Sequence, residues 1–111
     1  MIPDERPPIE VLRQASPAAA EEFQRLRAAV EDGVLDSPTI ELVLVAVLAA
    51  TRQDASMAVH ARRALALGVS PESLRHAIVS TLAAGTLFND VVGALRAIDR
   101  LAPAATTPAQ A

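Results

Sequence analysis

Apolar residues recur at helical spacing along most of the chain, in segments that are separated by strong start and stop signals. The clearest apolar row has the three- and four-residue steps of one helix face: Phe88, Val91, Leu95 and Ile98. Serine–proline pairs at Ser16, Ser37 and Ser70 have the form of a helix N-cap followed by proline in the first turn. Gly33 and Gly68 follow apolar segments, where a glycine commonly ends a helix.

These signals predict a short helical turn and five longer helices. The expected ranges are 9–14, 16–32, 37–52, 53–67, 70–84 and 87–101. Neither a strand-like alternation nor an Asn-Gly hairpin signal competes with them, so the fold class is expected to be all-α. Between Ile40 and Ala50 the only charged residue is Glu41, which is typical of a helix in the middle of a bundle or an assembly.

Length and composition predict one small helical domain that associates with other copies of itself. Prolines in 1–8 and the Ala/Thr/Pro-rich segment 102–111 indicate unstructured ends on either side of a single domain, 9–101. Apolar residues make up 51% of the 111 residues but aromatic residues only 2%, so the core must be built from alanine, leucine and valine in close-packed helices. Because so small a chain cannot hide this much apolar surface internally, we expect part of it to be buried between subunits.

Several classes of function are disfavoured by what the chain lacks. Residues 1–8 lack the apolar segment of a signal peptide, and the longest apolar run, Leu42 to Ala50, is far below the ~20 residues of a membrane helix, so a cytoplasmic protein is expected. The absence of cysteine excludes disulfides, thiolate metal sites and thiol catalysis. A net charge of −3 without tyrosine or tryptophan argues against nucleic-acid binding.

A small group of polar side chains is the best candidate for chemistry. Gln53, Ser56 and His60 stand at positions i, i+3 and i+7, which places them on one side of the helix expected over 53–67, and Arg63 extends the same row. If this helix and the preceding one form a hairpin, Glu41 faces the row. Periodicity alone leaves that arrangement open.

The segment Glu41-x11-Gln53-x2-Ser56-x3-His60 resembles the Glu, Cys-x-x-Cys and His pattern of alkylhydroperoxidase-D-like proteins in the carboxymuconolactone decarboxylase family. The later segment HARRALALGVSPESLRHAIVSTLAAGTLFNDVVGAL resembles the family's sequence of His-bearing helix, Pro-Glu cap, alanine-rich helix and Gly-x-x-x-Asn. The resemblance runs from about Ser16 to Ile98. It implies an oligomeric, alkylhydroperoxidase-D-like bundle of five to six helices, assembled as a homotrimer or homohexamer, with a small-molecule pocket near a subunit boundary.

Gln53 and Ser56 stand where the redox members of the family carry their two cysteines. A thiol peroxidase needs one thiolate to attack the peroxide and a second thiol to resolve the intermediate, so this activity is not expected. The resemblance instead implies a cofactor-independent lyase or isomerase. In that interpretation His60 and Glu41 transfer protons on a small carboxylated or carbonyl substrate, and the remaining candidates contact it: Ser56, Gln53, Arg62 and Arg63. Neither a metal nor an organic cofactor is expected.

Other interpretations of the same residues remain open. Glu41 also suits the first turns of a helix, where the dipole stabilises a carboxylate, and His60 also suits a subunit interface. The chain is then a non-catalytic family member that binds a ligand or serves assembly. A serine hydrolase using Ser56 is a third possibility, although no oxyanion-hole motif accompanies it. A metal site of Glu41, His60 and His76 lacks a ligand-spacing motif, while Met57 and Phe88 are expected to fill the core or an interface.

Overall fold

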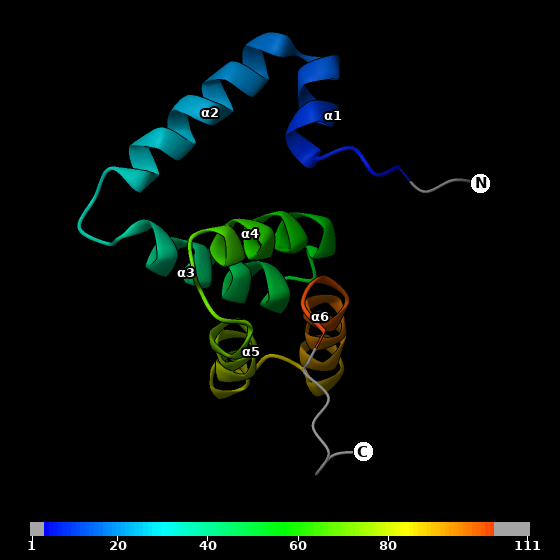
Figure 1. Ribbon diagram of the computed structural model, residues 1–111. Helices are drawn as coiled ribbons and strands as arrows, with labels where there is room; N and C mark the ends of the chain where they lie inside the picture. Colours follow the sequence, from blue (N-terminus) through cyan, green and yellow to red (C-terminus); the bar gives the residue numbers. More distant parts are fainter. Residues whose placement is uncertain (1–3, 104–111) are drawn as a thin grey trace.

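The computed structural model describes residues 4–103, and over this range the chain is helical without any strand (Figure 1). The elements are α1 (Pro8–Ala15), α2 (Pro17–Glu31), α3 (Ser37–Ala50), α4 (Asp54–Ala66), α5 (Pro71–Ser80), the short 3₁₀ helix η1 (Thr81–Ala84) and α6 (Phe88–Leu101). The all-α prediction is confirmed. Of the unstructured ends expected at 1–8 and 102–111, residues 1–3 and 104–111 lie outside the described residues, whereas Pro8 already belongs to α1. Across residues 4–103, no helix combines the length and the apolar character needed to cross a membrane.

The predicted start signals hold for two of the three serine–proline pairs. Ser16 and Ser70 are N-caps whose hydroxyl oxygens accept hydrogen bonds from backbone N–H groups three residues later, at 3.2 and 3.1 Å. For α3 the prediction was one residue late, because Asp36 rather than Ser37 is the N-cap. Its carboxylate accepts from the N–H of Thr39 at 2.9 Å, and hydrogen bonding to the side chain and then to the backbone of Thr39 lowers the pKa of Asp36.

The helix expected over 70–84 is split in the structure. It is α-helical only to Ser80 and continues as the tighter turn η1. The hydroxyls of Ser80 and Thr81 each donate to a backbone carbonyl one turn earlier at 2.7 Å, so side-chain hydrogen bonds accompany the change of winding. Gly85, with a φ of 93°, then ends the turn in the left-handed region that glycine adopts without strain.

The hydrophobic core is built by α3, α4, α5 and α6. The buried side chains come from all four helices and, apart from the unbranched Met57, are small or branched: Val45, Ala49, Met57, Ala61, Ala64, Leu74, Ile78, Val91, Ala94, Ala97 and Ile98. Helix α3 packs on the other three. Met57 is fully buried as expected, whereas Phe88 is exposed at the start of α6 and does not fill the core.

Helices α1 and α2 form a separate N-terminal hairpin, and they contribute no residue to this core. Figure 1 shows the hairpin on the side of α3 and α4 that is opposite to α5 and α6. The hairpin leaves part of α3 uncovered, because Val43 and Val47 are about half exposed. Part of the apolar surface of α3 is therefore exposed in the single chain, and burial of this surface in an assembly stays a prediction.

A tight turn joins α3 to α4 and reverses the chain. Arg52 has a left-handed backbone with a φ of 57°, and the N–H of Gln53 donates to the carbonyl of Leu48 at 2.9 Å. Because α3 and α4 then run side by side in opposite directions, the first turns of α3 lie beside the second half of α4. This geometry brings Glu41 next to His60.

Candidate functional site

Glu41 and His60 form a hydrogen-bonded pair between α3 and α4. Oε2 of Glu41 lies 2.7 Å from Nδ1 of His60. The Glu41 side chain is 5% exposed and that of His60 is 16% exposed, so the pair is largely shielded from solvent. The sequence left open whether these two residues face one another, and the α3–α4 hairpin brings them together.

The pairing fixes which nitrogen of the imidazole is available for chemistry. An ionised carboxylate can only accept hydrogen bonds, so Nδ1–H of His60 donates to Glu41. The second ring nitrogen, Nε2, then carries the lone pair. A histidine held in this tautomer by a carboxylate can take a proton at Nε2 and return it, which is the arrangement of an acid/base residue with its orienting partner.

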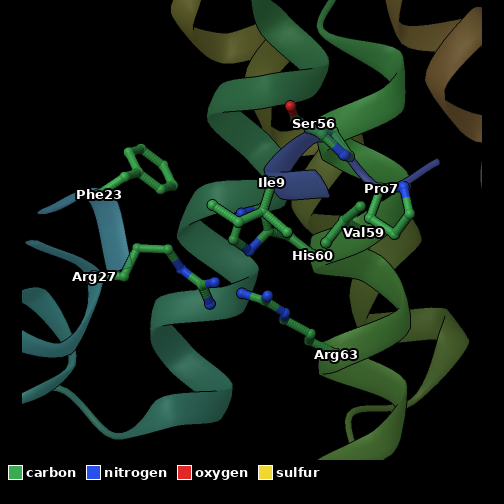
Figure 2. Close-up of a pocket in the computed structure, with 9 residues that line it drawn as sticks. Pro7, Ile9, Phe23, Arg27, Ser56, Val59, His60 and Arg63 are labelled. Carbon is green, nitrogen blue, oxygen red and sulfur yellow. The ribbon is translucent and has the colours of Figure 1, made fainter. Parts of the chain in front are cut away.

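His60 forms part of the wall of a cavity of about 120 Å³ between the N-terminal hairpin and α4. Figure 2 shows side chains from three segments around it. They are Pro7, Pro8 and Ile9 at the start of α1, Phe23 and Arg27 on α2, and Ser56, Val59, His60 and Arg63 on α4. The lining is mostly apolar, with the imidazole, one hydroxyl and two guanidinium groups as its polar members.

Two further hollows adjoin this cavity and share residues with it. One, of about 150 Å³, lies between α2 and α3 and is lined by apolar side chains together with Arg27, Glu31 and His60. The other, of about 330 Å³, is lined by Glu41, Glu31 and both arginines of the first cavity. Arg27 lines all three, so it lies where they meet.

Of the candidate substrate contacts, the structure places Ser56 and Arg63 in the cavity with His60. Figure 2 shows the hydroxyl oxygen of Ser56 on the side away from the His60 ring. Within residues 4–103 no hydrogen bond joins these two side chains, as a serine nucleophile with His60 as its base would require. The geometry therefore gives no support to the serine-hydrolase interpretation.

The structure separates Gln53 and Arg62 from this cavity. Gln53 is exposed just before α4, and its amide donates to the hydroxyl of Thr51 at 3.0 Å. Arg62 is exposed and lines a different hollow, on the other side of Val59, together with Asp4 and neighbouring residues. Helical geometry explains this, because Arg62 is two residues beyond His60 and so points about 200° away around α4.

The sequence analysis missed Arg27, which the structure places in the cavity wall. A signal was present, because Arg27 interrupts the apolar row of α2 four residues after Phe23 and three before Val30. A charged residue within an apolar row points toward the same part of the molecule as the apolar side chains around it. What the sequence did not reveal is that α2 faces His60.

His76, the second histidine, is exposed on α5. In the part of the chain that the structure describes, no three histidine, cysteine, aspartate or glutamate side chains cluster as a metal site would need. The Glu41, His60 and His76 site considered from the sequence is therefore not formed, since His76 does not join the other two.

The comparisons agree with this architecture. The family model for the carboxymuconolactone decarboxylase family matches residues 17–100, which span all of α2 to α5 and nearly all of α6. Searches among curated proteins and among solved structures gave no match. The matched region includes Glu41 and His60 and takes in most of the chain. The chain therefore belongs to the carboxymuconolactone decarboxylase family.

Proposed function

We propose that the protein is a cofactor-independent lyase or isomerase that moves protons on a small carboxylated or carbonyl substrate, with His60 as the acid/base residue and Glu41 as its partner. The observation that supports this is the 2.7 Å contact between Nδ1 of His60 and Oε2 of Glu41, with the His60 side chain in the wall of a mostly apolar cavity. Family membership supports the general kind of function. Without any cysteine the chain cannot carry out thiol-dependent peroxide reduction.

The proposed chemistry needs only His60, which lines the cavity, and Glu41, which is hydrogen-bonded to it. In an isomerisation, Nε2 of His60 takes a proton from the carbon next to a carbonyl, and the imidazolium returns it at another carbon. In a decarboxylation, Nε2 of His60 first takes a proton from solvent. The bond to the carboxylate then breaks, its electron pair passes into the carbonyl to form an enolate, CO₂ leaves, and the imidazolium gives its proton to the carbon. In both, Glu41 holds the ring and balances its positive charge.

The test is to look for proton transfer directly, without knowing the natural substrate. The wild-type protein is incubated in D₂O with a panel of β-keto acids, unsaturated lactone acids and simple keto acids, while NMR follows deuterium uptake and a coupled assay follows CO₂. We expect catalysed exchange or CO₂ release with at least one carboxylated carbonyl compound. Rates equal to those of buffer across the panel would contradict the proposal.

The alternative proposal, a non-catalytic family member that binds a ligand or serves assembly, has one observation in its favour. The cavity beside His60 measures about 120 Å³, below the roughly 300–1,000 Å³ typical of small-molecule sites. Under this alternative the D₂O experiment gives only buffer rates, and replacement of His60 changes neither ligand binding nor assembly.

We also propose that the protein assembles as a homotrimer or homohexamer. Apolar side chains that the single chain leaves exposed along α2, the following loop and α3 support this assembly. They are Phe23, Leu26, Val30, Val34, Leu35, Val43 and Val47. Contiguous exposed apolar surface is unfavourable in water and is removed when copies associate.

Light scattering after size exclusion is therefore expected to give three or six times the chain mass of 11.6 kDa. Val47→Glu is expected to reduce that mass, because association would bury the new charge. Gln24→Glu, which adds the same charge at an exposed polar position of α2, serves as the control. A monomeric wild-type protein at micromolar concentration would rule out this assembly.

A further inference from the structure

Two guanidinium groups from different helices meet beside His60. Arg27 extends from α2 and Arg63 from α4, and Figure 2 shows the two side chains directed toward one another below the imidazole. Both line the 120 Å³ cavity with His60 and the 330 Å³ hollow with Glu41. The two like charges repel each other, so an arrangement that brings them together is stabilised by an anion between them.

Arg63 lacks a hydrogen-bond acceptor for one of its guanidinium nitrogens. Its Nη1 is buried and has no hydrogen-bond partner within the described residues. A guanidinium stays charged under all conditions in a protein, and a buried charged donor without an acceptor is costly. An oxygen atom of a bound ligand would accept this missing hydrogen bond.

The two carboxylates beside the arginines do not supply that oxygen. Glu41 is engaged with His60 at 2.7 Å. Glu31 lies 3.5 Å from Nη2 of Arg27 and its side chain is 44% exposed, so this ion pair is long and solvent-screened, and contributes little. When His60 is protonated, the cationic groups of the site outnumber these two carboxylates.

We infer that Arg27 and Arg63 together bind an oxyanion of the substrate, and that Arg27 is a specificity-determining residue contributed by the N-terminal hairpin. The planar forks of two arginines fit a carboxylate best, and a phosphate shares the same chemistry. The role of this anion in catalysis rests on the proposed function. The inference therefore predicts an anionic substrate whose reacting carbon lies next to His60 when the two arginines hold the anion.

The anion site gives the N-terminal hairpin of α1 and α2 a function, although this hairpin takes no part in the packing of the core. Helices α1 and α2 contribute nothing to the buried cluster of α3 to α6, yet α2 carries one of the two arginines. An anion held by Arg27 and Arg63 links the hairpin to α4. Binding is therefore expected to slow hydrogen exchange of the α2 amides as well as those of α4.

The experiment titrates the wild-type protein with malonate and, separately, with inorganic phosphate at fixed low ionic strength, following heat by calorimetry and α2 amides by hydrogen exchange. Arg27→Gln and Arg63→Gln are each expected to raise the Kd by at least about tenfold. The matched controls are Arg25→Gln on α2, whose guanidinium pairs with Glu21 and Glu22, and Arg62→Gln on α4, and both should stay within about twofold of wild type. Arg63→Lys, which keeps the charge but loses the fork, should give an intermediate Kd.

Tighter binding of malonate than of phosphate would assign a carboxylate, and the reverse order a phosphorylated substrate, each through the same arginine pair. No measurable binding of either anion, or equal losses in the control variants, would overturn the inference. Deuterium exchange of a responsive substrate, measured on the same preparations, keeps the two outcomes apart, because anion binding without proton transfer would contradict the proposed function and leave the arginine site standing. Loss of the anion site with proton transfer intact would remove this inference and leave the proposed function standing.

Discussion

His60→Gln is expected to lower turnover of any responsive substrate by about 10²–10⁴-fold, the usual contribution of a positioned acid/base group. Glutamine fills similar space and can still hydrogen-bond to Glu41, but its amide cannot exchange a proton near neutral pH. The loss should fall on kcat, with KM little changed, because substrate contacts to the arginines remain. Steady-state kinetics with the substrate found by deuterium exchange gives both parameters.

The chain offers a matched control in its other histidine. His76→Gln makes the same chemical change on the exposed surface of α5 and should leave kcat within about twofold of wild type. Far-UV circular dichroism and light scattering on each variant separate a chemical effect from loss of fold or assembly. Wild-type turnover by the His60 variant would remove the imidazole from the mechanism, and with it the proposed function.

Ile78→Ala is expected to lower the free energy of unfolding by about 2–5 kcal/mol, the largest stability effect that we predict. Ile78 is fully buried in the cluster that joins α3 to α6, so truncation loses apolar burial and leaves a cavity. Since small domains are stable by only about 5–15 kcal/mol, this loss is a large fraction of the total. Urea unfolding at one protein concentration, kept fixed because subunit association also stabilises, measures it.

Val79→Ala is the control for this prediction. It removes apolar atoms from the next residue of α5, but Val79 is 41% exposed, so the expected change is below about 1 kcal/mol. If the two variants unfold at the same urea concentration, the packing described for α5 is wrong.

The helices were predictable because their ends are set by local chemistry. Ser16 and Ser70 cap helices through bonds to backbone groups three residues away, and each is followed by a proline that suits the first turn. The departures were also local. Asp36 replaced Ser37 as a cap because a carboxylate one residue earlier reaches Thr39, and the end of α5 tightened into η1.

The candidate site was predictable only in part. The resemblance to the family pattern implied that Glu41 and His60 act together. Their contact depends on the reversal at Arg52, and no residue pattern predicted the left-handed backbone of that residue. Arg27 was missed, and Arg62 was grouped with Arg63 although α4 turns it away from the cavity.

The sequence by itself determined the helical fold class, most helix boundaries, the absence of thiol chemistry and the family, since each depends on residue type or on interactions within a few positions. The tertiary structure decided which faces meet. Only the packing of α3 on α4 joins a buried carboxylate to an imidazole, and only the position of the N-terminal hairpin sets Arg27 opposite Arg63. The physical reason is that periodicity defines the face of a helix but not its partner, because similar apolar faces can pack together in many ways.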